Sequence, residues 1–307
     1  MTDTRLVLEG ASKWYGQVIG LNDVSCTIGP GVTALLGMNG AGKSTMMRLI
    51  TGQIRPTTGT VRVYGQEPFA NPEVYKHLGY CPEIDNFYEH MTGRQFVYHL
   101  ARLQGLEPPR AKARTVEVID SVGMTDRCDR KIAGYSKGMR QRIKLAQAMI
   151  HDPDIILLDE PLNGLDPIAR HDFIQLLHSL SDLGKTIMVS SHILFEVEQM
   201  TRSILLLHRG RLLASGDLKV IRELMDKYPH RVKIETPQGR ELAGKLAAEA
   251  NVLSVQFVRE GIELQVKEPN RFYDRLASLV MEEGFAVTRY GSPDNNLESI
   301  FRYLVNE

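Results

Sequence analysis

The sequence predicts an α/β domain built on a parallel sheet, followed by a smaller α+β domain. Apolar segments at 32–36, 155–158 and 186–190 alternate with stretches of helical composition, which is typical of a parallel sheet covered by helices. A chain of 307 residues also exceeds the roughly 100 to 200 residues of one domain. Near Lys227-Tyr228-Pro229-His230 the composition changes, and strands of alternating apolar and polar residues follow.

The composition excludes several classes of protein. Apolar residues make up 43% of the chain and charged residues 24%, as in ordinary globular domains. The 37 basic and 37 acidic residues cancel, which argues against a nucleic-acid binder with a large basic surface. No apolar run approaches the roughly 18 residues of a membrane-spanning helix. The start lacks a signal-peptide pattern and the three cysteines form no Cys-x-x-Cys pair, so we expect a cytoplasmic protein.

The elements of the first domain follow from short apolar patterns. Alternation at Leu6 and Leu8, and again from 24 to 28, predicts two early strands. The apolar strand 32–36 runs into a glycine-rich turn, and a helix follows from Lys43. Residues 149–158 contain the end of a helix and a second buried strand, and 186–190 forms a third. We place the end of this domain at residue 226.

The second domain, 231–307, has alternating strand and helix patterns. The order β-α-β-β-α-β is the ferredoxin-like pattern. It is built from a strand at 231–235, a helix at 240–250, a strand at 252–258, a turn at Gly261, a strand at 262–267, a helix at 270–283 and a strand at 286–290.

A glycine-rich motif predicts a nucleotide site. Residues 37–44, Gly-Met-Asn-Gly-Ala-Gly-Lys-Ser, match G-x-x-x-x-G-K-[ST] between a strand and a helix. Glycines let backbone N–H groups surround phosphates, Lys43 reaches the terminal phosphates, and Ser44 can ligate Mg²⁺. The motif alone does not separate a kinase from a GTPase or a transport ATPase. Its candidate nucleotide-binding residues are Gly37, Asn39, Gly40, Ala41, Gly42, Lys43, Ser44 and Thr45.

A second cluster follows the buried strand 155–158. Asp159 can hold Mg²⁺ directly or through water, and Glu160 can orient or deprotonate the attacking water. An acidic pair at the start of a helix would explain these two residues equally well. The motif Tyr-Ser-Lys-Gly-Met at 135–139, just upstream, removes that ambiguity.

These motifs, taken in order, resemble the ATP-binding subunits of ABC transporters, strongly from about Leu6 to Gly216 and weakly after Arg231. The resemblance implies a P-loop cassette with a helical subdomain at about 84–150. It further implies that Ser136 and Gly138 close over the γ-phosphate of ATP bound to a partner subunit. It assigns Asp166, within Asn163-Gly164-Leu165-Asp166, to a loop linking two sites, His192 to a γ-phosphate switch, and Tyr15, or neighbouring Trp14, to stacking on adenine.

Two positions depart from the usual pattern of this family. The signature usually reads Leu-Ser-Gly-Gly-Gln, so Lys137 either adds a cation near the triphosphate or is solvated. Glu83 stands where a glutamine is usual, so it either coordinates Mg²⁺ or faces solvent or the membrane partner. Both changes resemble bacterial exporters of drug, sodium or metal-centre-maturation type, in which the ATPase and the membrane protein are separate chains.

The resemblance implies an ATPase that uses ATP and Mg²⁺ and works as a homodimer, or with a paired ATPase subunit. It would act on a membrane-spanning permease at the inner face of the cell membrane, without nucleic acid. A soluble ABC ATPase of the iron–sulfur-assembly type is the alternative, whereas a P-loop kinase has no use for Ser136, Gly138 and His192 in this order. The tail either braces the dimer or is a regulatory module, and Asn296–Phe301 resembles the final helix of such extensions.

Overall fold

The computed structural model describes residues 4–217 and 229–292. The chain forms two compact units, Met1–Gly216 and Asp217–Glu307. The composition change that we used to place the boundary begins inside 218–228, which lies outside the described residues, as does the predicted final helix at Asn296–Phe301. The two units are described separately below.

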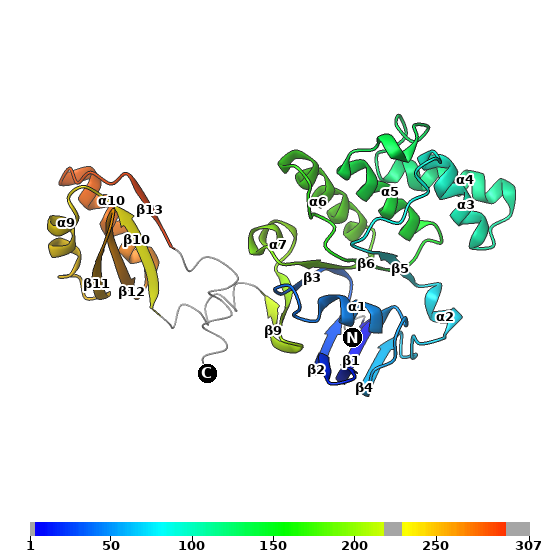
Figure 1. The fold of residues 1–307 in the computed structure, drawn as a ribbon, viewed down its shortest axis with the longest axis horizontal. Helices are drawn as coiled ribbons and strands as arrows, with labels where there is room; N and C mark the ends of the chain where they lie inside the picture. The colour runs from blue at the N-terminus through cyan, green and yellow to red at the C-terminus, as the bar shows by residue number, and fades with distance from the viewer. Residues whose placement is uncertain (1–3, 218–228, 293–307) are drawn as a thin grey trace. The chain divides into compact units, whose positions relative to one another are not determined.

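In residues 4–216 the strands form a three-stranded and a six-stranded sheet (Figure 1). The smaller sheet is antiparallel, with the order β2-β1-β4, and the larger has the order β5-β6-β7-β3-β8-β9, parallel from β5 to β8. The predicted early strands are confirmed, but the second begins at Val18 rather than at Val24. The strands are β1 (Leu6–Tyr15), β2 (Val18–Ile28), β3 (Gly31–Leu36), β4 (Thr58–Val63), β5 (Leu78–Cys81), β6 (Ile155–Leu158), β7 (Thr186–Ser191), β8 (Ser203–His208) and β9 (Arg211–Asp217).

Helices in this unit start at residues that suit helix N-termini. Thr92 and Gln95 form a capping box at the start of α3, and Pro72, Pro108 and Pro167 stand in the first turns of their helices. The helices are α1 (Lys43–Ile50), α2 (Pro72–Tyr75), α3 (Gly93–Leu103), α4 (Pro108–Ser121), the 3-10 helix η1 (Ile132–Gly134), α5 (Lys137–Met149), α6 (Pro167–Asp182) and α7 (Leu194–Met200).

Helix α1 belongs to the core between the two sheets. Its residues Met46, Met47 and Ile50 are fully buried. They pack in one cluster with apolar side chains of both sheets, such as Leu8 of the smaller and Leu157 of the larger. Because α1 follows β3 directly through the glycine-rich turn, this packing fixes the turn at the carboxyl edge of the parallel sheet, where such sheets bind ligands.

The second unit forms the predicted ferredoxin-like order. Its antiparallel sheet has the order β11-β12-β10-β13, and both helices contribute to one apolar core. The elements are β10 (His230–Glu235), α9 (Gly239–Leu246), β11 (Val252–Val258), β12 (Gly261–Val266), α10 (Pro269–Glu282) and β13 (Arg289–Gly291).

Two element boundaries in this unit differ from the prediction by more than one residue. Helix α9 ends at Leu246, its last buried apolar residue, because residues 247–251 turn the chain into β11. The last strand begins at Arg289 instead of 286. Ala286 bonds instead to side chains, donating to Gln238 Oε1 at 2.8 Å and accepting from Thr236 Oγ1 at 2.6 Å.

None of the helices in the described ranges is both long enough and apolar enough to span a bilayer.

The cysteines give a first testable prediction. Burial raises the pKa of Cys26 and of Cys81 to about 12, and burial also raises the pKa of Cys128. Because the thiolate is the reactive form, we expect native Cys26 and Cys81 to react with DTNB at pH 8 at least about 100-fold more slowly than a free thiol. All three cysteines should react at normal rates in guanidinium chloride. A fast-reacting native thiol at position 26 or 81, identified by mass spectrometry, would contradict this packing.

Candidate nucleotide-binding site

The turn between β3 and α1 has a backbone path that requires glycine. Gly40 and Gly42 have φ angles of +79° and +108°, which side chains disfavour. A Cβ atom on Gly42 would lie 2.5 Å from the carbonyl oxygen of Gly20, and one on Gly37 would lie 2.7 Å from that of Leu207. Gly42 is also the N-cap of α1, and it has no side chain that could occupy the free N–H groups of the first turn. The turn therefore offers backbone donors and a helix N-terminus to an anion.

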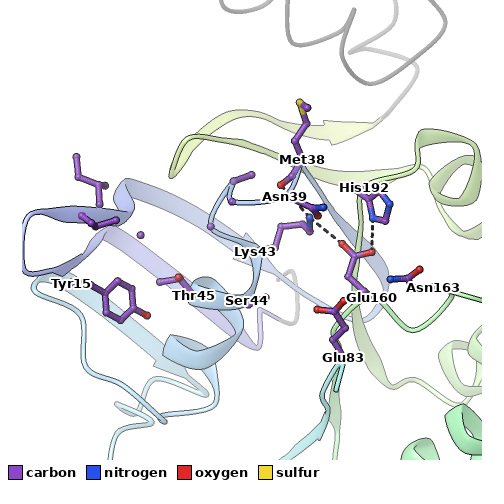
Figure 2. Close-up of a pocket in the computed structure, with 16 residues that line it drawn as sticks. Tyr15, Met38, Asn39, Lys43, Ser44, Thr45, Glu83, Glu160, Asn163 and His192 are labelled. Carbon is purple, nitrogen blue, oxygen red and sulfur yellow. Dashed lines mark hydrogen bonds and ion pairs between the residues drawn. The ribbon is translucent and has the colours of Figure 1, made fainter. Parts of the chain in front are cut away.

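A cavity of about 520 Å³ opens at this turn (Figure 2). Its volume falls within the usual range of small-ligand sites, roughly 300 to 1,000 Å³. Most of the predicted site residues line it, namely Tyr15, Asn39, Gly40, Ala41, Gly42, Lys43, Ser44, Thr45, Glu83, Glu160 and His192. The prediction of site residues missed further lining residues: Val18, Ile19, Gly20, Met38 and Asn163.

Lys43, Glu160 and His192 form a connected group in this cavity (Figure 2). Lys43 is 6% exposed, and its Nζ donates to the carbonyl oxygens of Gly37 at 2.6 Å and Met38 at 3.3 Å. The same Nζ lies 3.0 Å from Oε1 of Glu160, whose Oε2 lies 2.9 Å from Nδ1 of His192. The lysine is thus held by the glycine-rich turn and pairs with the carboxylate that follows β6. The sequence patterns did not predict this ion pair.

Ser190 positions the two acids that follow β6. Its Oγ donates to Oδ1 of Asp159 at 2.7 Å and accepts from the backbone N–H of Glu160 at 2.7 Å. Asp159 is 4% exposed and is not part of the cavity lining, while Glu160 has a φ angle of 48° that turns the chain at this point. Ser190 was not among the predicted site residues. Ser190 lies beside Asp159 because Leu158 pairs with Val189 across β6 and β7, and the sequence patterns give no signal for that pairing.

The other predicted residues lie outside this cavity. Ser136 caps α5 by accepting from the backbone N–H of Met139 at 3.3 Å. Asp166 caps α6 by accepting from the backbone N–H groups of Ile168 and Ala169. A Cβ atom on Gly138 would lie 3.4 Å from that of Ala169, so the first turns of α5 and α6 are neighbours. Both capping residues are exposed, so another molecule can reach them.

Tyr15 lies at the end of β1 on the α1 side of the cavity (Figure 2). Its ring is partly exposed, and Nζ of Lys13 lies 5.7 Å from the ring centroid. Trp14, which the structure also describes, is not part of the cavity lining. Of the two aromatic side chains, Tyr15 is therefore the one that a molecule bound in the cavity can contact.

Comparison with known proteins identifies the family. The model of the family described as ABC transporter matches residues 21–163. The ABC transporter ATP-binding protein NatA of Bacillus subtilis is 39% identical over 206 residues, which are 66% of this chain and 84% of that protein. The chain belongs to the ABC transporter ATP-binding proteins. Its cassette is an ATPase domain, and such cassettes bind ATP or ADP.

Other ABC transporter proteins match over different lengths. The daunorubicin/doxorubicin resistance ATP-binding protein DrrA of Streptomyces peucetius is 32% identical over 301 residues, 96% of this chain and 90% of that protein. An uncharacterized ATP-binding protein of Nostoc is 41% identical over 209 residues, 67% of this chain but 62% of the relative. A solved ATP-binding subunit of an ABC transporter matches with a TM-score of 0.64 at 31% identity, covering 72% of this chain and 93% of that one. The predicted family and cassette fold are therefore confirmed.

The residues of this ABC cassette fit a magnesium nucleotide better than a bare metal ion. Mg²⁺ usually keeps waters and binds one or two carboxylates together with substrate phosphates. Ser44 and Glu83 line the cavity. Asp159 directly follows β6 and precedes Glu160, which also lines the cavity. Within residues 4–217 and 229–292, no group of three or more His, Cys, Asp or Glu residues could hold a metal ion. The backbone cradle supplies the phosphate site that such an ion needs.

Proposed function

We propose that this chain is the ATP-hydrolysing subunit of an ABC exporter and works as a head-to-tail homodimer with a separate permease. The observation that supports the dimer is the division of the site residues. One chain brings Lys43, Glu160 and His192 into its cavity but leaves Ser136 and Gly138 outside it, at the exposed start of α5. A second copy that places its own Ser136 over the cavity would supply further donors for the γ-phosphate.

In this proposal each residue has a definite task. The glycine-rich turn and Lys43 bind the phosphates, and Tyr15 contacts the adenine. Mg²⁺, held by Ser44, Asp159 and Glu83, would offset the charge of the phosphates. Glu160, kept in place by Ser190, accepts a proton from the attacking water, and His192 contacts the γ-phosphate. Asp166, as the cap of α6, would hold the loop that links the two sites.

We further propose that the cassette, 1–226, contacts the permease through its helical subdomain at about 84–150, and that the accessory domain is 231–307. The segment after Glu83 supports this contact. Ile84 is 71% exposed and Tyr88 is 61% exposed, so two large side chains of this segment are accessible to a partner. Phe87 packs its ring edge to face on Phe96 of α3, with the centroids 5.2 Å apart. The chain would then be peripheral to the inner face of the cell membrane. The Nod factor export ATP-binding protein I of Paraburkholderia xenovorans, to which the chain is 31% identical over 218 residues, supports the direction of transport.

An affinity pull-down tests the proposed function. The bait is full-length Glu160→Gln chain with Mg-ATP, applied to detergent-solubilised membranes of the source organism, and the captured proteins are identified by mass spectrometry. We expect a stoichiometric multi-span protein, and we expect Lys43→Ala bait to capture at least about tenfold less of it. Replacing Ile84 and Tyr88 with serine should also reduce capture. Recovery of soluble partners alone would contradict the transporter role and favour the iron–sulfur-assembly alternative.

A further inference from the structure

One face of α5 carries three basic side chains that form ion pairs with the segment 82–89. Lys137, Arg140 and Lys144 are spaced by three and four residues, so they lie along the same side of the helix. All three contact residues of the segment 82–89, which connects β5 to the region before α3. These ion pairs therefore extend along about two turns of α5.

Lys144 is the buried end of this row. The residue is 2% exposed, and its Nζ donates to the carbonyl oxygens of Pro82 at 2.9 Å and Glu83 at 3.0 Å. Oδ1 of Asp85 lies 2.9 Å from the same nitrogen. A lysine ammonium has three N–H donors, and three oxygens surround this one. A buried ammonium is costly unless it is compensated in this way, so the contact fixes the segment to the helix.

Asp85 and Glu89 also form ion pairs near the start of α5. The second carboxylate oxygen of Asp85 lies 3.5 Å from Nζ of Lys137, beside Ser136. Burial alone would raise the pKa of Asp85, but Lys144 and then Lys137 lower it below its usual value. Arg140 binds both carboxylate oxygens of Glu89, at 2.6 Å and 2.9 Å. The segment is thus tied to the first turn of α5 as well as to its middle.

The two ends of this assembly face different nucleotides in the proposed dimer. Glu83 lines the cavity of its own chain, while Ser136 caps the same α5 and lies outside that cavity. Lys144 connects Glu83 to the helix that Ser136 caps. Its Nζ donates to the carbonyl oxygen of Glu83, and Lys144 belongs to α5. These contacts attach the segment to α5, so a change in the position of Glu83 can be passed to the helix.

We propose that Lys144 and Asp85 are positioning residues that couple nucleotide contact at Glu83 to the placement of Ser136 and Gly138 over the second copy's site. This inference rests on the proposed function, because it needs the head-to-tail dimer. In it, ATP bound in one cavity sets the position of the α5 N-terminus that the same chain offers to its partner. Neither residue needs to touch the nucleotide.

ATP-dependent dimerisation of the full-length chain tests this coupling. In a Glu160→Gln background, Lys144→Met and Asp85→Asn should each raise the ATP concentration for half-maximal dimer formation by about tenfold, as measured by sedimentation velocity. Binding of a fluorescent ATP analogue at protein concentrations too low for dimers should change by less than about twofold. Since the two residues act as one unit, the double variant should lose no more than Lys144→Met alone.

A matched control separates coupling from stability. Lys185→Met removes another largely buried lysine, 16% exposed and 2.8 Å from Asp152, far along the chain from the segment. It should lower the melting temperature without moving the dimerisation midpoint. If Lys144→Met and Asp85→Asn behave like this control, the coupling is refuted. If Lys144→Met fails to fold, the dimerisation midpoint of Asp85→Asn alone tests the coupling. That variant keeps both carbonyl contacts of Lys144.

The same experiment distinguishes failure of the coupling from failure of the proposed function. A parent Glu160→Gln chain that forms no dimer at saturating Mg-ATP contradicts the proposed dimer itself. A parent chain that dimerises, with variants that dimerise at the same ATP concentration, contradicts only the role of Lys144 and Asp85.

Discussion

Replacing Glu160 with glutamine should reduce ATP turnover by roughly 10²- to 10⁴-fold, the usual contribution of a positioned general base. Glu160 is 7% exposed, the Ser190 hydroxyl holds its backbone N–H at 2.7 Å, and Lys43 and His192 contact its carboxylate oxygens, so the group is positioned without a ligand. Glutamine keeps the shape of the side chain and its contact with His192 but cannot accept a proton from water. The variant also loses the negative charge that pairs with Lys43 at 3.0 Å. ATP binding should therefore be preserved or strengthened.

Steady-state phosphate release and equilibrium ATP binding on the same preparation check this prediction. Glu73→Gln is a suitable control, because that carboxylate is 69% exposed and pairs with Lys76 outside the cavity. It should turn over ATP at the rate of the unaltered chain. Turnover within about tenfold of normal in Glu160→Gln would remove Glu160 from the role of general base.

Sequence patterns predicted the parts of the site that lie on single elements. The turn at 37–44, the acids at 159–160 and His192 each follow a strand of the parallel sheet, and β5 ends just before Glu83. Parallel strands end at the same edge, so these side chains could be expected to gather there. In the structure Glu83, Glu160, His192 and most of the turn line one cavity, whereas Asp159 is not part of its lining.

Contacts between elements could not be predicted in this way. The bond from Ser190 to Asp159 depends on β6 and β7 being neighbours in a particular register. The buried position of Lys144 depends on α5 packing against the end of β5, although its sequence neighbours alone suggest an ordinary charged helix. Motif spacing gives no information on strand order or helix packing, and so these polar side chains were missed. The start of β13 was wrong for a related reason, since the side chains of Gln238 and Thr236 bond to the backbone of Ala286.

Replacing Lys43 with alanine should weaken ATP binding by roughly 10- to 100-fold, since a charge-assisted hydrogen bond to phosphate contributes about 1.5 to 3 kcal/mol. The ammonium group is already directed into the glycine-rich turn by the carbonyl oxygens of Gly37 and Met38. Little ordering is then needed when phosphate binds. Isothermal titration with ATP and Mg²⁺ measures the loss, and undiminished affinity would refute the assignment of the turn as the phosphate site.

The ion pair with Glu160 offers a second explanation for such a loss, and a double variant separates the two. Lys43→Ala leaves the Glu160 carboxylate buried without its cation, so it should lower the melting temperature and place an uncompensated negative charge near the phosphates. Lys43→Ala with Glu160→Gln removes that charge. If Lys43 binds phosphate directly, the double variant should regain thermal stability but not ATP affinity. Recovery of ATP affinity in the double variant would instead mean that Lys43 serves mainly to neutralise Glu160.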